Sequence, residues 1–133
     1  MKLPLRCLGA LALACTLSTL TGCASEYDHT EIGKPRQSVL GGRVDRSGIE
    51  VPEGMVVTVH IVSYNDDHNI MTMNVRAKDP SILDVSNVIS DHDFAFIGLK
   101  QGATEVEVLA DNRVVLVMSA VVGPQSAASV TTP

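Results

Sequence analysis

Apolar and polar residues alternate with a period of two through the central part of the chain. Residues 55–63 read MVVTVHIVS and residues 70–77 read IMTMNVRA, so apolar side chains recur at every second position of each run. Residues 104–110 continue the alternation, and residues 113–122 form a long run that is rich in β-branched residues. Successive side chains of a strand point to opposite faces, so this period predicts half-buried antiparallel strands. The sequence shows no clear amphipathic-helix period.

Turn-forming residues separate the apolar runs. Pro, Gly, Asn and Asp favour tight reversals of the chain, and they occur in Pro52-Glu53-Gly54, Asn65-Asp66-Asp67, Asp79-Pro80, Lys100-Gln101-Gly102 and Asp111-Asn112. We expect strands at residues 39–44 with 49–51, 55–63, 70–77, 82–86, 94–99, 103–110 and 113–122. About seven short antiparallel strands at this spacing predict an all-β fold, a single immunoglobulin-like β-sandwich.

The N-terminus has the three parts of a bacterial export signal. Lys2 and Arg6 give a positive start, residues 7–20 are mostly apolar, and small residues then precede Cys23. The apolar run is shorter than the about 20 residues that a membrane-spanning helix needs. The residues Leu20-Thr21-Gly22-Cys23 resemble the lipobox of bacterial lipoproteins. The resemblance implies cleavage before Cys23 and acylation of its sulfur and its new amino group. An ordinary secretory signal and an uncleaved apolar helix are the alternatives.

The chain then divides into four segments. Residues 1–22 are the predicted signal peptide, and residues 23–37 contain the acylated cysteine and a polar segment that we expect to be a flexible tether. Residues 38–123 form the predicted immunoglobulin-like domain, and the small, polar residues 124–133 are an expected disordered tail. Resemblance to envelope lipoproteins, with Ala24 rather than Asp after the cysteine, favours the outer membrane. In a Gram-positive host the protein would be a surface lipoprotein.

The mature chain is acidic and keeps one cysteine. Cleavage before Cys23 removes 22 of the 133 residues and leaves 111, with 15 acidic and 8 basic residues and a net charge of −7. An acidic chain repels phosphate backbones, which argues against nucleic acid as a partner. Cys7 and Cys15 are lost with the signal, so no internal disulfide can form and stability must come from packing.

Two stretches resemble the group 2 bacterial immunoglobulin-like (Big) family. Residues 79–86 (DPSILDVS) are similar to its DPS-apolar-x-x-V stretch, and residues 98–108 (GLKQGATEVEV) are similar to its G-V-K-x-G-x-A-T-I-T-V stretch. Residues 51–54 (VPEG) stand where the family has an early V-x-x-G turn. The resemblance implies an immunoglobulin-like fold and brings no catalytic residue with it.

The chain departs from that family at one core position. The family usually has a tryptophan on the strand before Asp79, whereas this chain has no tryptophan and places Val75 there. We expect Phe94, Phe96 and the methionines to fill the core instead. A rival resemblance is to the small N-terminal domains of secretin-type pilus and secretion components, which share a dp-x-x-adv…G-x-x-x-G-x-T cadence and likewise bring no catalytic residue.

Three predicted loops lie at one end of the sandwich, because consecutive antiparallel strands alternate their connections between its two ends. These loops are residues 64–69, 87–93 and 111–112. Oxygen ligands suit Ca²⁺, and imidazoles with a carboxylate suit Zn²⁺. The candidate metal ligands are Asp66, Asp67, His68, Asp91, His92 and Asp93. The candidate contacts of a ligand or partner are Tyr64, Phe94 and Asp111.

Both sets have an ordinary structural alternative. Asp, Asn and His are common in exposed turns because they tolerate unusual backbone angles and form local hydrogen bonds. Tyr64 and Phe94 also suit the core or its rim.

The sequence favours a protein without catalytic activity. Ser63 and Ser90 have no evident base with an orienting group, and the expected acylation of Cys23 would leave no free thiol as a nucleophile. We therefore expect no cofactor beyond the lipid on Cys23, and a lipid-anchored envelope lipoprotein that binds a protein or surface polymer, or has a structural or adhesive role. The alternatives are an accessory subunit of a secretion or pilus assembly and a periplasmic metal-binding protein.

Overall fold

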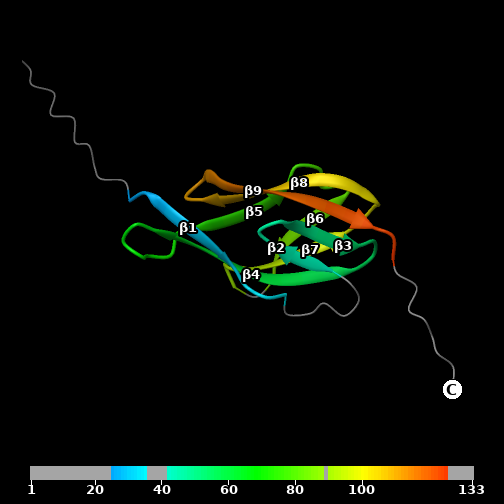
Figure 1. The fold of residues 1–133 in the computed structure, drawn as a ribbon, viewed down its shortest axis with the longest axis horizontal. Helices are drawn as coiled ribbons and strands as arrows, with labels where there is room; N and C mark the ends of the chain where they lie inside the picture. The colour runs from blue at the N-terminus through cyan, green and yellow to red at the C-terminus, as the bar shows by residue number, and fades with distance from the viewer. Residues whose placement is uncertain (1–24, 36–41, 89, 126–133) are drawn as a thin grey trace, which may run out of the picture.

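The chain folds into two facing β-sheets (Figure 1). The structure is a computed structural model and describes residues 25–35, 42–88 and 90–125. One sheet has four strands in the order β1-β4-β7-β6, and the other has five in the order β2-β3-β9-β8-β5. The strands are β1 Tyr27–Ile32, β2 Arg43–Asp45, β3 Gly48–Pro52, β4 Val56–Asn65, β5 Met73–Ala77, β6 Leu83–Asn87, β7 Asp93–Gly98, β8 Gly102–Ala110 and β9 Arg113–Gly123.

The predicted immunoglobulin-like β-sandwich is confirmed, with two differences in detail. The described residues contain nine strands rather than about seven, because β2 and β3 are separate and β1 was not expected. One strand pair is parallel: Ile49–Pro52 of β3 lies opposite Ala120–Gly123 of β9. No described residue belongs to a helix that is long and apolar enough to cross a membrane.

The core lies between the sheets and is filled without tryptophan, as expected. Phe94 and Phe96 on β7 have no exposed surface, and Met118 on β9 is 2% exposed. Val75, which stands at the family's tryptophan position, is 4% exposed and belongs to the same cluster. Aromatic and methionine side chains therefore supply the volume that the missing tryptophan would have filled.

The prediction of a flexible tether over residues 23–37 is wrong for the part that forms β1. Strand β1 pairs antiparallel with β4, so that Thr30 lies opposite Ser63 and Ile32 opposite Ile61. Thr30 is 2% exposed, and its Oγ1 lies 2.7 Å from the Oγ of Ser63, which is fully buried. A hydroxyl pair thus helps to fix a segment in which Ile32 is the one aliphatic side chain packed against the core. The signal peptide, Cys23 and residues 126–133 of the predicted tail lie outside the described residues.

Candidate functional site

The β4–β5 loop forms the end of the sandwich where the candidate site was expected. Strand β7 begins opposite His60, so the last five residues of β4 extend beyond it. The chain then reverses tightly: the amide of His68 donates to the carbonyl of Asn65 over 2.9 Å, and the amide of Asn69 donates to Asn65 Oδ1 over 2.7 Å. His68 has a φ of 61°, a left-handed conformation common in such turns. Asp66, Asp67 and His68 are exposed at this reversal.

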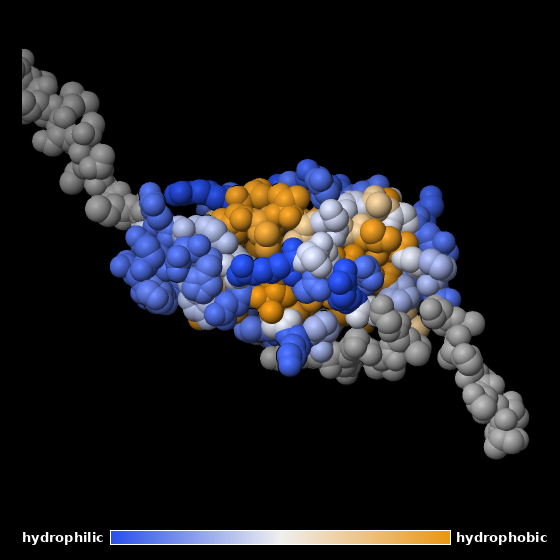
Figure 2. Space-filling model, viewed as in Figure 1, coloured by the Kyte–Doolittle hydropathy of each residue, from blue (hydrophilic) through white to orange (hydrophobic). Residues whose placement is uncertain are grey.

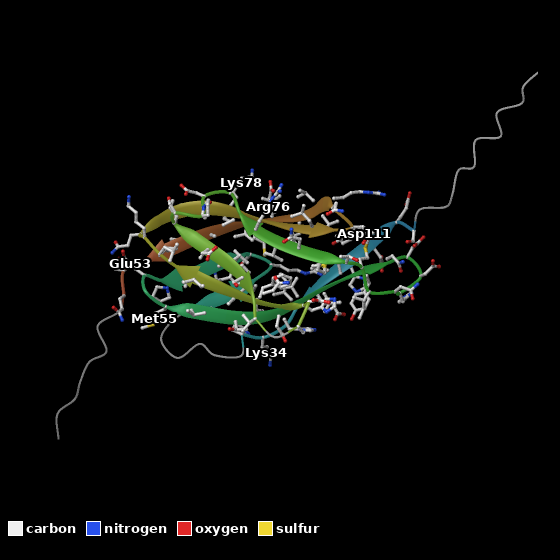
Figure 3. All side chains as sticks on the ribbon, turned by 180° about the vertical axis from the view of Figure 1, so that it is seen from behind. Lys34, Glu53, Met55, Arg76, Lys78 and Asp111 are labelled. Carbon is white, nitrogen blue, oxygen red and sulfur yellow. The ribbon has the colours of Figure 1, made fainter. Side chains whose placement is uncertain are left out.

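Asp111 joins a second loop to the same end. Its amide donates to the carbonyl of Thr72 over 2.9 Å, and its Oδ1 accepts a hydrogen bond from the amide of Thr72 over 3.1 Å. Asp111 and Asn112 have φ values of 47° and 63°, the two left-handed residues that a two-residue hairpin of this kind requires. The carboxylate of Asp111 therefore has a structural partner, and Figure 3 shows this residue at the opposite end of the sandwich from Glu53 and Met55.

The β6–β7 loop meets the start of β5 at a surface cleft of about 400 Å³. Its lining residues are Ile70, Met71, Thr72, Met73, Asn87, Asp91 and His92. Met71 and Met73 are less than 9% exposed and also belong to the core, whereas Ile70 is 56% exposed. The cleft thus combines an apolar side with a polar rim, and it places the predicted loop of residues 87–93 beside residues 70–73, which lead into β5.

Asp93 is a buried carboxylate at the start of β7, rather than an exposed ligand in a loop. It is 5% exposed; its Oδ2 accepts a hydrogen bond from the Ser90 hydroxyl over 3.0 Å, and its Oδ1 lies 2.9 Å from His60 Nδ1. The carboxylate therefore stands between the hydroxyl and the imidazole. A serine nucleophile needs the imidazole as its immediate partner. Here the carboxylate of Asp93 lies between Ser90 and His60, so the arrangement does not activate Ser90.

The contact between His60 and Asp93 was not predicted from the sequence. The side chain of His60 is 43% exposed, and the strand register puts this residue directly opposite Asp93. The ring of His92 lies 6.0 Å from that of His60, measured between centroids. Pairing the predicted strands 55–63 and 94–99 in register would have been the signal for this cluster.

The six candidate metal ligands do not form a metal centre. Across residues 25–35, 42–88 and 90–125, no three side chains of His, Cys, Asp or Glu are grouped in a way that could hold a metal ion. Asp66, Asp67 and Asp91 are exposed, and His92 is half-buried. We therefore assign neither Ca²⁺ nor Zn²⁺ to this end.

The two aromatic candidates have different positions. Phe94 is fully buried in the core, so its prediction as a contact of a ligand or partner is wrong; as residue two of β7 it points inward with Phe96. Tyr64 is half-buried at the end of β4, and its ring stacks on that of His29 with 5.0 Å between centroids. Tyr64 therefore helps to attach β1 to β4.

The outer face of the five-stranded sheet carries a second surface that the sequence analysis did not single out. Val114, Val117 and Val121 on β9 are each 47% exposed, and Figure 2 shows apolar surface in this region. Salt bridges flank these valines: Arg76 to Glu107 at 2.8 Å, Lys78 to Glu105 at 2.6 Å and Arg43 to Glu50 at 2.9 Å. The partners of each bridge lie on strands of the same sheet, except for Lys78, which directly follows β5, so the charges are matched within the face.

Comparison with known proteins supports the β-sandwich fold, and it does not assign the chain to a protein family. No family model and no curated protein matches the sequence. Among solved structures, domains 1–6 of the surface layer protein SbsC match 79% of the chain with a TM-score of 0.57 and 14% identity. The S-layer protein rSbsC(31-844) matches 74% with a TM-score of 0.52 and 15% identity, and domains 4–9 of SbsC match 69% with a TM-score of 0.51 and 20% identity. The chain spans 13–15% of the length of these proteins.

Proposed function

We propose that the protein is a lipid-anchored envelope lipoprotein that presents a non-catalytic immunoglobulin-like domain for binding or for a structural role. The observation that carries this proposal is the sequence Leu20-Thr21-Gly22-Cys23 after a charged and apolar start. Two or more acyl chains on Cys23 would make a durable anchor, because one chain alone binds a membrane only marginally.

The geometry of the polar residues supports a role without catalysis. The best-placed serine, Ser90, donates its hydrogen bond to the carboxylate of Asp93 rather than to a histidine. The cleft beside it has buried methionines on one side, which suits contact with an apolar group more than chemistry on a substrate. These observations favour contact surfaces over an active site.

The structural neighbours are consistent with a role at the cell surface. They are domains of proteins described as surface layer proteins, and each resembles this chain in fold at 14–20% identity. A sandwich that offers exposed valines on one sheet face has the kind of surface through which proteins associate. Membership of the Big family remains part of the proposal.

Acylation is tested by expressing the full chain in a bacterial host and measuring the mass of the mature N-terminus. We expect cleavage before Cys23, an added mass of two or three acyl chains, and recovery in the membrane fraction. The Cys23→Ser variant is the matched control and should be neither acylated nor held in that fraction. An unmodified thiol at residue 23 in the wild-type protein would overturn the proposal.

A further inference from the structure

Strand β1 starts at the end of the sandwich that carries the β4–β5 loop, which we call the loop end. The carbonyl of Glu26 accepts a hydrogen bond from the amide of Asp66 over 2.9 Å, and Tyr27 lies opposite Asn65 in the β1–β4 pair. Figure 1 shows the start of β1 beside the β4–β5 loop, whereas β9 runs to the other end. The backbone before Glu26 is thus attached to the same loop that carries Asp66 and Asp67.

The chain between this end and the cysteine is short. Cys23 precedes Glu26 by three residues, and three residues span at most about 11 Å when fully extended. The 15-residue tether expected from the sequence would have let the domain turn freely above a membrane. Because β1 already begins at Tyr27, acyl chains on Cys23 would hold the loop end close to the lipid.

The exposed side chains at this end suit a headgroup layer. Tyr27 is 38% exposed and Ile70 is 56% exposed, and tyrosine is favoured where an apolar region meets water. The carboxylates of Glu26, Asp66 and Asp67 are exposed beside them. Charged groups are costly in hydrocarbon, so these carboxylates limit the depth that the loop can reach.

We propose that the loop end, defined by Glu26, Tyr27, Asp66, Asp67 and Ile70, faces the phospholipid headgroups and fixes the orientation of the domain. The proposal rests on acylation of Cys23. The opposite end, with the β7–β8 turn at Lys100 and Gln101, then points away from the membrane. Strand β4 alone has ten residues, which separates the two ends by about 30 Å.

Site-specific quenching in vesicles tests this orientation with the lipidated full chain. Cys23 is the only cysteine after cleavage and its sulfur would be acylated, so a cysteine introduced at Asp67→Cys or Gln101→Cys is the only free thiol for a fluorophore. Both residues are exposed turn positions, which makes them a matched pair. The vesicles contain phosphatidylcholine with a fraction of headgroup spin-labelled lipid as the quencher.

We expect the label at residue 67 to be quenched several-fold more strongly than the label at residue 101. Equal quenching, or stronger quenching at residue 101, would overturn the orientation if the same samples float with the vesicles. If the wild-type protein does not float with the vesicles, or if the Cys23→Ser variant floats equally well, the lipoprotein function itself would be contradicted. A Gly/Ser insertion of about 15 residues between Ala24 and Ser25 should remove the difference between the two labels. A difference that survives this insertion would contradict the short-tether explanation.

Discussion

Asp93 illustrates how a buried charge is accommodated in a small core. Its backbone and side chain both contribute to the turn before β7: its amide donates to the carbonyl of Ser90 over 3.1 Å, and its Oδ2 accepts from the hydroxyl of Ser90. His60 contacts its other oxygen. Hydrogen bonds to a charged group at a poorly solvated site contribute more than those at an exposed one.

We predict that Asp93→Ala lowers the free energy of unfolding by about 1–3 kcal/mol, because the substitution removes the carboxylate that contacts Ser90 and His60. Urea denaturation monitored by circular dichroism measures this change. Asp91→Ala is the matched control: it removes an exposed carboxylate from the same loop and should change the free energy of unfolding by less than about 0.5 kcal/mol. Equal effects of the two substitutions would show that burial of Asp93 does not matter.

A second aspartate gives a pH dependence. The hydroxyl of Ser81 donates to Asp79 Oδ1 over 2.6 Å, and the amide of Ser81 donates to the same atom over 3.0 Å. These hydrogen bonds, the one from the hydroxyl most of all, lower the pKa of Asp79 below its ordinary value of 3.8. A carboxylate whose pKa is lower in the folded chain stabilises the fold above the unfolded pKa. That contribution is lost as the pH falls from about 3.8 through the lower folded value.

We therefore expect Ser81→Ala to reduce the loss of stability on acidification below about pH 4. Urea denaturation at a series of pH values from about 2 to 6 measures the slope in the two proteins. Ser86→Ala, at an exposed position of β6, serves as the comparison and should leave the slope unchanged. A slope that is the same in Ser81→Ala and in the wild type would refute this assignment.

At the scale of single elements, the contact between β1 and β4 depends on a buried pair of hydroxyls. Removing one partner of a buried hydrogen bond leaves the other unsatisfied, whereas replacing both by apolar groups can be nearly neutral. We predict that Thr30→Val lowers the free energy of unfolding by about 1–2 kcal/mol, because it leaves the Ser63 hydroxyl without Thr30 as its partner.

The double variant Thr30→Val with Ser63→Ala should then be closer in stability to the wild type than Thr30→Val alone. Chemical denaturation of both single variants and the double variant gives the coupling energy between the two residues. Strictly additive losses would show that the two hydroxyls do not act together.

The strands that carry alternating apolar residues could be predicted from sequence, and β1 could not. For β4, the expected bounds of 55–63 are close to the observed Val56–Asn65, because Val57, Val59 and Ile61 alternate with polar residues. Strand β1 reads YDHTEI, and its one fully buried residue is a threonine. Its position depends on Ser63, 33 residues away in the sequence, so no local pattern reveals it.

The candidate site was predicted in outline rather than in its contacts. The turns at residues 65–67 and 111–112 lie at the expected end because alternating strands determine their direction. The burial of Asp93 was not expected, because it stood in a polar loop and was assigned to the surface, whereas Phe94 was expected both in the core and as a surface contact. The start of β7 lies opposite His60, five residues before the end of β4, and this stagger of strands is a tertiary property.

At the scale of the whole molecule, the described surfaces differ in chemistry. The loop end carries exposed carboxylates, whereas the outer face of the five-stranded sheet carries valines between matched salt bridges. With the loop end turned toward lipid, the valine face would lie along the side of the domain and remain open to a partner. Anchoring and association would then use separate parts of one small sandwich.

The entry of the chain at one end and its exit at the other also determine how the domain responds to mechanical load. A pull between the start of β1 and the end of β9 acts along the strands. The hydrogen bonds between β1 and β4 are perpendicular to that direction, so they are strained together in shear rather than broken one after another. A domain tethered in this way would transmit tension between a membrane and whatever is attached at its far end.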